Sequence, residues 1–463
     1  MKQKEYPILK DTVRIKKMDA FCWISELFSD SGTTASPMEC FILSLCSGEY
    51  TTSQIAYIYR KLFQMEEAKA NQDVQDTLKR LDTCISYNTT TSKIVQRYLP
   101  ESFLYHPRKM ENNPRGKFDS PAEAVFALTK NCNFKCIYCY NSSGEQKKDE
   151  LCTEQWLDAV RQMKELDVVK CTLTGGEPFL HPGFFEILTS LAENDIMPYI
   201  CTNGSLLNEG AISRLAELQI PLVQISLDSS SPDEHDALTC SHNTFPTITN
   251  AIKRLVSLGI RVYVKSVILP QNLRHVGELI NLCHDSGVAN LVLDQYDLSY
   301  GGRGGNHFFL NEEQNKWLKE IVSRKKEAIH DMNINLISGS RNWKCKDDIV
   351  MCGAMIRSFV IMPDGEYALC EKLENIPQMS VGNFKEMPIR QMWNSDKIDE
   401  ILLPPKEHYE EPCRSCEYLD SCGSGCYAAK LCVDASFYAP DPKCWRANYK
   451  DNKFIEKSGE TTC

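Results

Sequence analysis

One stretch organises this chain: Cys132-Asn-Phe-Lys-Cys136-Ile-Tyr-Cys139-Tyr-Asn. Its three cysteines fall within eight residues, directly after the apolar segment 124–128. A strand that ends there would present all three thiolates from one loop at the carboxyl edge of a sheet. Thiolates are soft ligands that select zinc, Cu(I) or iron–sulfur clusters. The stretch therefore predicts a metal or cluster site, with zinc and a chance grouping of cysteines as the alternatives.

The composition is typical of a soluble globular protein, with 42% hydrophobic and 25% charged residues. At 463 residues the chain is long enough for two or three domains. Its net charge of −10 argues against a broad nucleic-acid or anionic-membrane surface. No apolar run reaches the roughly 18 residues of a membrane span, and the first residues lack an apolar signal core. We therefore expect a cytoplasmic protein with no nucleic-acid and no membrane partner.

Cysteine is frequent, with 22 residues in the chain. In a reducing cytosol, cysteines serve metal binding or catalysis more often than disulfides. They are also unevenly placed, since seven lie between Cys345 and Cys426.

Residues 1–95 are predicted to form a small separate domain of two strands and three helices. The strands are expected at 13–17 and 20–24, and the helices begin after Ser36, after Thr51 and at Asn71. Ser36 with Glu39, three residues on, is typical of a capping box at a helix start. Residues 96–120 are polar and rich in Pro and Asn, which predicts a linker.

From 121 to 310, strand-like and helix-like segments alternate, and their strands lack the polar alternation of half-exposed strands. Six β/α units predict an α/β fold with a partial parallel (β/α)6 barrel related to the eightfold one, with its chemistry at the carboxyl ends of the strands. A connecting helix is expected within 311–344. The predicted strands are 123–129, 169–175, 197–203, 222–228, 260–268 and 289–295, and the predicted helices are 153–166, 184–193, 207–218, 245–258 and 273–286.

Polar motifs fall at these strand ends. After the second strand comes Thr174-Gly-Gly-Glu-Pro178, whose glycines permit close backbone approach and whose Glu177 can accept a hydrogen bond from an ammonium group. An ordinary turn is the alternative. Asn203, Ser226, Asp228 and Lys265 lie at later strand ends, where capping of the strands would explain them equally well.

A second cysteine pattern fills residues 345–463. Cys345 and Cys352 precede Gly365-x4-Cys370, and the segment Cys413-x2-Cys416-x5-Cys422-x3-Cys426 is followed by Cys444. Zinc ribbons also use paired cysteines, so zinc is the alternative to iron–sulfur clusters here.

The first motif resembles the C-x3-C-x2-C signature of the radical S-adenosylmethionine (SAM) enzymes, including the aromatic Tyr138 before the last cysteine. The resemblance implies a 4Fe–4S cluster on Cys132, Cys136 and Cys139 whose open iron chelates SAM, which is then cleaved to a 5′-deoxyadenosyl radical. It also implies that Tyr138 contributes to cofactor binding and that Gly175, Gly176 and Glu177 hold the SAM amino group. Asn203, Ser226, Asp228 and Lys265 would line the ribose and carboxylate pocket. Related enzymes have an arginine where this chain has Thr239, so Ser226, Lys265 or another basic group would take the carboxylate.

The later cysteines resemble the SPASM domain, the auxiliary-cluster extension of peptide-modifying radical SAM enzymes. The resemblance implies two more 4Fe–4S clusters, making three in all. Cys413, Cys416, Cys422 and Cys444 would hold the outer one, and Cys352, Cys370 and Cys426 the inner one, with Cys345 as its fourth ligand. Without Cys345 the inner cluster would have an open iron for a substrate thiolate. Glu371 matches a carboxylate that takes a substrate proton in some relatives; a solvated surface glutamate is the alternative.

The first domain resembles the winged-helix-like (PqqD-like) module that binds leader peptides by adding a strand to its sheet edge. A generic winged-helix oligomerisation domain is the alternative. Together these resemblances imply a radical SAM peptide maturase similar to sactipeptide and ranthipeptide enzymes. It would act on a ribosomally made precursor, form a cysteine thioether, and receive electrons from a donor such as flavodoxin or ferredoxin. Carbon–carbon crosslinking, formylglycine formation and a non-catalytic iron–sulfur or zinc scaffold that binds a peptide are the alternatives.

Overall fold

The computed structural model divides into two units, which are described separately. Unit 1 comprises Met1–Asn113, Phe118–Ala122 and Asp167–Lys170, and unit 2 comprises the rest of the chain. The residues that the structure describes are 5–26, 32–90, 97–105, 117–297, 302–337, 352–374, 376–432, 436–442, 444 and 446.

Unit 1 contains two small sheets and three helices. The elements are β1 (Tyr6–Leu9), β2 (Val13–Lys17), β3 (Cys22–Glu26), β4 (Thr33–Ala35), α1 (Pro37–Ser44), α2 (Thr52–Phe63), α3 (Glu67–Arg80), η1 (Asp82–Cys84), β5 (Ile85–Asn88) and η2 (Pro100–Phe103). One sheet has the antiparallel order β2-β3-β4, and β1 pairs antiparallel with β5. The predicted strand pair and three helices are therefore present, and β1, β4 and β5 are additional.

Local sequence explains the helix starts of unit 1. Ser36 and Glu39 form the predicted capping box, and Thr51 and Gln54 form a second one. The third helix begins at Glu67, four residues before the predicted start, because buried Ala70 already belongs to its core-facing side. Part of the segment predicted as a linker also packs in this unit, since Phe103 is only 1% exposed within its core.

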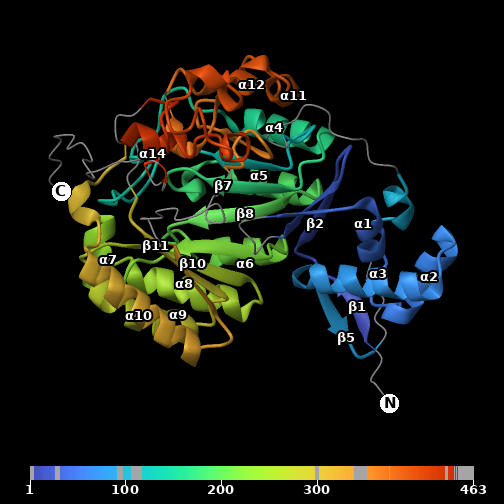
Figure 1. The fold of residues 1–463 in the computed structure, drawn as a ribbon. Helices are drawn as coiled ribbons and strands as arrows, with labels where there is room; N and C mark the ends of the chain where they lie inside the picture. Colours follow the sequence, from blue (N-terminus) through green and yellow to red (C-terminus); the bar gives the residue numbers. More distant parts are fainter. Residues whose placement is uncertain are drawn as a thin grey trace. The chain divides into compact units, whose positions relative to one another are not determined.

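Unit 2 is built on one ten-stranded sheet in the order β12-β11-β10-β9-β8-β7-β6-β13-β14-β15. Figure 1 labels β7, β8, β10 and β11 of this sheet. The strands are β6 (Glu123–Ala127), β7 (Lys170–Thr174), β8 (Met197–Thr202), β9 (Leu222–Ser226), β10 (Arg261–Ile268), β11 (Asn290–Gln295), β12 (Asn333–Ile337), β13 (Ser358–Ile361), β14 (Glu366–Ala368) and β15 (Ser380–Asn383). Pairing is parallel from β8 through β12 and between β6 and β13. All six predicted strands are found within two residues of their expected ends.

Helices follow the strands in the β/α alternation. They are α4 (Thr153–Glu165), η3 (Pro178–Leu180), α5 (Phe184–Glu193), α6 (Glu209–Glu217), α7 (Pro232–Thr239), α8 (Phe245–Ser257), η4 (Leu273–His275), α9 (Val276–Asp285), η5 (Asn306–Phe308) and α10 (Glu312–Ala328). The predicted α/β fold with a partial barrel is thereby confirmed. Helix α7 was not predicted, and α10 is the expected connecting helix.

The carboxyl-terminal segment continues the barrel sheet. Strand β13 pairs with β6 in the register Ser358↔Glu123 to Ile361↔Phe126, and β14 and β15 extend the sheet as antiparallel strands. Short helices then follow: η7 (Glu371–Leu373), α11 (Ile389–Trp393), α12 (Asp396–Leu402), η8 (Lys406–His408), α13 (Leu419–Cys422) and α14 (Tyr427–Cys432). The second cysteine pattern is therefore attached directly to the strand that carries the first.

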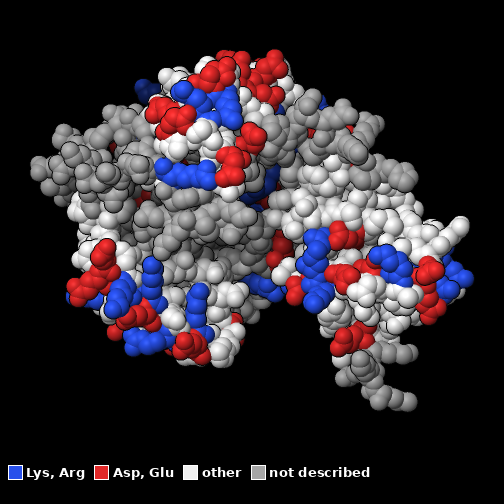
Figure 2. Space-filling view, viewed as in Figure 1, with Lys and Arg blue, Asp and Glu red and all other residues white. Residues whose placement is uncertain are grey.

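On the face shown in Figure 2, basic and acidic side chains are interspersed rather than segregated by sign. Within the described residues, every helix is too short or too polar to cross a bilayer.

Candidate active site

The three cysteines of the first motif lie in the loop that follows β6. The loop is closed at its base, because the amide of Cys132 donates to the carbonyl of Gly144 over 3.3 Å and the amide of Gly144 donates to Lys130 over 3.0 Å. A tight turn places Cys136 next to Cys139, whose amide donates to the Cys136 carbonyl over 3.2 Å. The loop thus presents its thiols from a backbone that is held by hydrogen bonds. This agrees with the prediction that the three cysteines lie in one loop at the end of a strand.

The thiols lie within electrostatic reach of one another. Burial raises the pKa of Cys136 well above its ordinary value, and Asp228, Cys139 and Cys132 raise it further. Burial also raises the pKa of Cys132 to about 11. Thiolates in this place therefore need positive partners, which metal ions supply.

Within the described residues, no three His, Cys, Asp or Glu side chains are gathered closely enough to hold a metal ion as they stand. The donor set, three neighbouring thiols on one loop, fits an iron–sulfur cluster in its chemistry.

The Gly-Gly-Glu-Pro loop after β7 packs against the cysteine loop. The amide of Gly176 donates to Thr129 over 2.7 Å, and that of Glu177 donates to Asn131 over 2.8 Å. Gly175 has a φ of +138°, and a Cβ atom on Gly176 would come within 2.2 Å of the Asn131 carbonyl oxygen. Glycine is thus required at these positions because the loop lies directly against the backbone of the cysteine loop. The sequence predicted a close backbone approach but not its partner.

Glu177 is completely buried. Its carboxylate accepts hydrogen bonds from the Thr202 hydroxyl at 2.7 Å and from the Asn203 amide at 2.8 Å, both at the end of β8. Burial raises the pKa of Glu177 to about 7, and the hydrogen bonds from Asn203, Thr202 and Phe179 oppose that rise. The side chain therefore braces two strand ends directly beside the cysteine loop.

Tyr138 and Asp228 connect the cysteine loop to the opposite side of the barrel mouth. The Tyr138 hydroxyl donates to one carboxylate oxygen of Asp228, and the amide of Val267 donates to the other at 2.9 Å. Asn272 donates to the Asp228 carbonyl at 2.7 Å. Asp228 thus joins the ends of β9 and β10 to the residue before the third cysteine.

Asn203 also reaches the cysteine loop. Its side-chain nitrogen donates to the Asn133 side chain over 2.9 Å, and its proximity opposes the rise that burial causes in the pKa of Cys132. Ser226 ends β9 opposite Lys265 of β10 in the sheet register. The predicted pocket residues are therefore gathered at one edge of the sheet.

Three charged residues, Lys265, Asp294 and Glu371, lie at the barrel mouth near the second cysteine region. The Lys265 ammonium lies 3.0 Å from the Asp294 carboxylate. Burial raises the pKa of Glu371, and Lys265 and Lys372 lower it, so the Glu371 carboxyl faces the Lys265 side of the barrel. Burial raises the pKa of Tyr140 well above its ordinary value, and Glu371 and Cys139 raise it further. Glu371 is half-buried, and its carboxyl lies close to these barrel side chains.

Thr239, which stands where related enzymes have an arginine, lies at the end of α7. Thr239 is 1% exposed, and its hydroxyl donates to the His235 carbonyl at 2.8 Å. The carbonyls of Leu238 and Thr239 accept the amides of Ile137 and Lys135, at 3.0 and 3.1 Å. The end of α7 thus secures the cysteine loop through its backbone.

Sequence reasoning missed Arg303. Its guanidinium donates to the carbonyls of Ser143 at 2.6 Å and Cys136 at 3.4 Å, and its amide donates to Cys139 at 2.8 Å. The available signal was an arginine flanked by two glycines on each side, placed after the sixth predicted strand.

A second missed network joins the cysteine loop to the carboxyl-terminal segment. Lys130 donates to Asn141 at 2.6 Å and forms an ion pair with Glu374. Lys147 pairs with the same Glu374 at 2.6 Å and with Asp364 at 3.1 Å. Both cysteine regions are therefore held together by ion pairs that are largely shielded from solvent.

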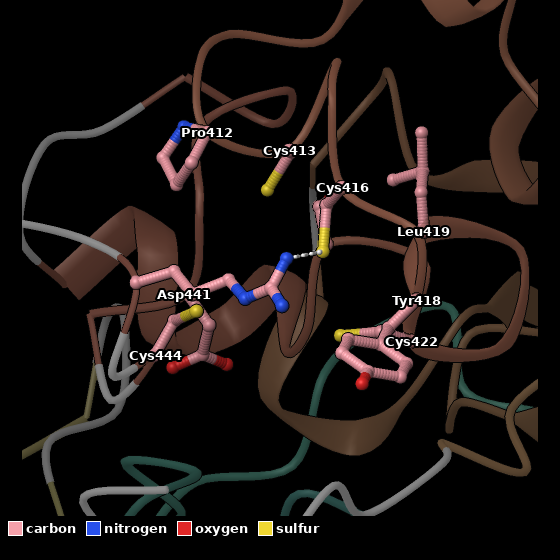
Figure 3. A pocket seen from close by; sticks show the side chains of 10 residues that line it. Pro412, Cys413, Cys416, Tyr418, Leu419, Cys422, Asp441 and Cys444 are labelled. Atoms are coloured by element: carbon pink, nitrogen blue, oxygen red, sulfur yellow. Dashed lines mark hydrogen bonds between the residues drawn. The ribbon is translucent and has the colours of Figure 1, made fainter. Parts of the chain in front are cut away.

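The outer set of cysteines lines one pocket with about 390 Å³ of space that no atom fills, part of it open to solvent. Figure 3 shows the sulfurs of Cys413, Cys416, Cys422 and Cys444 around this space. Burial raises the pKa of Cys413 to about 12, Lys430 lowers it, and Cys444, Cys422 and Cys416 raise it. The four predicted ligands are therefore together, and their chemistry fits a thiolate-bound cluster.

The inner set is gathered in the same way. Burial raises the pKa of Cys370 to about 12, and Cys352, Cys426 and Glu371 raise it further. Three of its predicted members thus lie near one another, close to the glutamate that follows Cys370. The predicted fourth member, Cys345, lies outside the described residues.

A partial parallel barrel whose strand ends collect cysteines, followed by an extension with further cysteines, defines an iron–sulfur enzyme of the α/β class. Residues 126–283 match the radical SAM superfamily, and residues 352–417 match SPASM, an iron–sulfur cluster-binding domain. The chain therefore contains a radical SAM domain and a SPASM domain, and it is an enzyme.

The chain is also similar to curated proteins over most of its length. The chain is 26% identical over 343 residues to "Mycofactocin maturase MftC" of Mycobacterium tuberculosis, covering 73% of this chain and 86% of that protein. It is 27% identical over 318 residues to "Antilisterial bacteriocin subtilosin biosynthesis protein AlbA" of Bacillus subtilis, covering 68% of this chain and 69% of that protein.

Streptococcus suis SuiB superposes with a TM-score of 0.67 at 17% identity, over 94% of this chain and 99% of SuiB. SuiB bound to precursor peptide SuiA superposes with a TM-score of 0.65 at 16% identity, over 95% of this chain and 100% of SuiB. At this identity the likeness supports the fold.

Proposed function

We propose that the protein is a peptide maturase that cleaves SAM reductively, abstracts a hydrogen atom from a ribosomally made precursor and forms an intramolecular crosslink. The observation that carries the proposal is the gathering of three cysteine groups within one unit, with Glu371 between the barrel mouth and the inner group. The named activities of MftC and AlbA, a maturase and a bacteriocin biosynthesis protein, support a peptide substrate.

The proposed SAM site lies over the cysteine loop. Cys132, Cys136 and Cys139 would hold a 4Fe–4S cluster, which supplies the electron that breaks a sulfonium C–S bond of SAM. Glu177 would hold the SAM amino group at the loop that Gly175 and Gly176 pin in place. Asn203, Ser226 and Asp228 would line the ribose side. Lys265 would take the SAM carboxylate, in exchange for its ion pair with Asp294.

Two auxiliary clusters are part of the proposal, which makes three 4Fe–4S clusters in all. Their ligands would be the outer and inner cysteine sets defined above, with Cys345 completing the inner one. Forming a crosslink removes two hydrogen atoms, and the SAM-derived radical takes one of them. The remaining proton and electron must leave the peptide, and auxiliary clusters accept electrons. A flavodoxin or ferredoxin would supply the electron for SAM cleavage.

Glu371 would act as the general base for the substrate proton. Its half-buried carboxyl lies close to Lys265 of the barrel and to Cys370 of the inner set. A general base must reach its proton within hydrogen-bonding distance, and a group between the barrel mouth and the inner set is suitably placed for a peptide that enters there.

Unit 1 would bind the precursor's leader in the manner of a PqqD-like module. Its three-stranded sheet has β4 at one edge, where Thr33 and Thr34 are exposed, whereas residues 13–16 of β2 at the other edge are buried. An exposed edge is what strand addition requires. We therefore assign leader binding to β4.

A cytoplasmic location, where the many free thiols stay reduced, belongs to the same proposal.

The crosslink that we favour is a thioether between a cysteine sulfur and a carbon of another residue. Carbon–carbon coupling and formylglycine formation are the alternatives. The test first identifies short cysteine-rich reading frames near the gene, and then incubates the reconstituted enzyme with SAM, dithionite and synthetic copies of the peptides that they encode. We expect a product lighter by two hydrogens whose cysteine resists alkylation. An alkylatable cysteine in a product of that mass would indicate carbon–carbon coupling, and absence of 5′-deoxyadenosine would refute radical SAM activity.

A further inference from the structure

Two cations lie at the outer cysteine set. Lys430 of α14 is fully buried, and its ammonium donates to the Ser424 hydroxyl and to the Phe437 carbonyl at 2.8 Å. Its nitrogen also lies 4.8 Å from the centre of the Tyr427 ring. Ser424 belongs to the short loop between Cys422 and Cys426 and lines the pocket of Figure 3. A charge so deeply buried is costly unless it is paired.

Arg446 lies at the solvent side of the same pocket. Its guanidinium donates to the sulfur of Cys416 at 3.5 Å, the dashed contact in Figure 3, and to the Glu417 carboxylate at 2.8 Å. The guanidinium carbon lies 5.0 Å from the centre of the Tyr418 ring. An arginine held on three sides is pre-organised to present its N–H group to a sulfur.

The nearby carboxylates offset these cations unequally. Asp441 is 2% exposed, lines the pocket, and accepts the Cys426 amide at 2.7 Å. The Glu417 side chain is 66% exposed, so water and salt screen its charge. Asp441 therefore opposes Lys430 inside the protein. Glu417 offsets the charge of Arg446 in part, but Arg446 keeps its N–H contact with the sulfur of Cys416.

We infer that Arg446 and Lys430 raise the reduction potential of the cluster held by the outer cysteines, with Arg446 having the larger effect. The inference rests on the proposed function, because it presupposes that cluster. Adding an electron makes a thiolate-bound cluster more negative. Positive charge and N–H donors at its sulfurs therefore stabilise the reduced form. The inner set has the Glu371 carboxyl beside it. An electron shared between the two sites would thus reside preferentially at the outer one, with no bond formed or broken.

The test is an anaerobic redox titration of the reconstituted enzyme, monitored by electron paramagnetic resonance, with iron and sulfide counted for every variant. The outer cluster's signal is identified by its loss in a Cys413→Ala/Cys416→Ala variant. Arg446→Gln should make reduction at least about tenfold less favourable, which is about 59 mV lower for a one-electron couple. Lys430→Met should shift the potential in the same direction by less, and Asp441→Asn should shift it upward.

Lys406→Met is the matched control, because it removes one positive charge from an exposed side chain of the same segment and should leave the potential unchanged. Fully loaded Arg446 and Lys430 variants with the wild-type potential would overturn the inference. If Lys430→Met lost irons, Lys430 would be a residue that holds the loop through Ser424, and the inference would fail for Lys430. The potential measured for Arg446→Gln would then test the inference for Arg446. A wild-type enzyme without the outer cluster would refute the proposed cluster set, which the iron count reports independently of any potential.

Discussion

The hydroxyl of Thr202 donates a hydrogen bond of 2.7 Å to the buried carboxylate of Glu177. Because Glu177 follows β7 and Thr202 ends β8, this bond joins two strand ends beside the cysteine loop. Both partners are almost fully buried, at 0% and 4% exposure. The carboxylate that the sequence assigned to SAM is thus also part of the barrel's own framework.

Replacing Thr202 by Val should destabilise the enzyme. The variant keeps the side chain's shape but removes this donor from a buried carboxylate oxygen, and it also removes the acceptor of the Gly204 amide. Each buried polar group left without its partner costs about 1–3 kcal/mol. Thermal unfolding at one fixed scan rate should show a lower midpoint. Thr189→Val is the control, because within the described part of the chain the Thr189 hydroxyl donates to the Phe185 carbonyl of its own helix and not to another element. Equal losses in the two variants would contradict a special role for the Thr202 bond.

SAM affinity should depend on pH through Glu177. Burial raises its pKa to about 7, so the free enzyme carries a proton there below that pH. If the carboxylate binds the SAM ammonium, binding must release this proton. Affinity should then fall as the pH falls from about 7.5 to 6, by up to about tenfold per unit below the pKa. The amino group of SAM, with an ordinary pKa of about 7.7–8.0, stays mostly protonated below about pH 7.5.

Anaerobic equilibrium dialysis with SAM measures this dependence. Glu177→Gln should bind SAM more weakly and without the pH dependence. A flat wild-type affinity across the window would show that Glu177 braces the strands without contacting the ammonium.

Much of the barrel was predictable because its strands and helices carry their own signals. Helix α5 was predicted with its observed ends, since Phe184, Ile187, Leu188 and Leu191 form one buried face. Helix α7 was missed because its eight residues include four acidic or polar ones near the start and show little apolar periodicity. Pairing of β13 with β6 could not be foreseen, because nothing local relates segments more than 230 positions apart, as in Ser358↔Glu123.

The grouping of the cysteines in space was predictable from their spacing in the sequence. The hydrogen bonds and ion pairs that hold the cysteine loops were not predictable. Tyr138 and Asp228 were each assigned to SAM, and the structure joins them to each other. Arg303, between pairs of glycines, resembles a loop residue in sequence, and its role depends on carbonyls from the cysteine loop. Such contacts come from tertiary structure, so sequence pattern alone does not contain them.

Changing Cys132, Cys136 and Cys139 together to Ala should remove about four of about twelve irons and all SAM cleavage. The reason is that these thiols are proposed to be the protein ligands of the SAM-binding cluster. Iron analysis and 5′-deoxyadenosine chromatography provide the two measurements. Cys283→Ala is the control, because Cys283 is a buried thiol of α9 whose pKa is raised by burial alone. A triple variant that still cleaves SAM would refute the cluster assignment.

Glu371→Gln should lower crosslinking by about 10²–10⁴-fold, the usual contribution of a general base, while 5′-deoxyadenosine formation continues. Glutamine keeps the shape but cannot take a proton. Mass spectrometry of the precursor and chromatography of the nucleoside separate the two activities. The exposed Glu386, changed to Gln, serves as the control. A loss of both activities together would assign Glu371 to SAM or cluster binding instead.

We expect the inner cysteine set to determine how the proposed crosslink forms. Cys352→Ala should abolish crosslinking while 5′-deoxyadenosine formation persists, because the inner cluster is proposed to accept the surplus electron and Cys352 lies beside Cys370. Cys345→Ala should retain substantial crosslinking, since an iron freed by its loss can bind the substrate thiolate, lower the thiol's pKa and fix its position. For both variants, mass spectrometry of the precursor after alkylation measures how much crosslink has formed. If Cys345→Ala abolishes crosslinking with its irons intact, the substrate sulfur does not need an open iron, and thioether formation must proceed with the sulfur unbound.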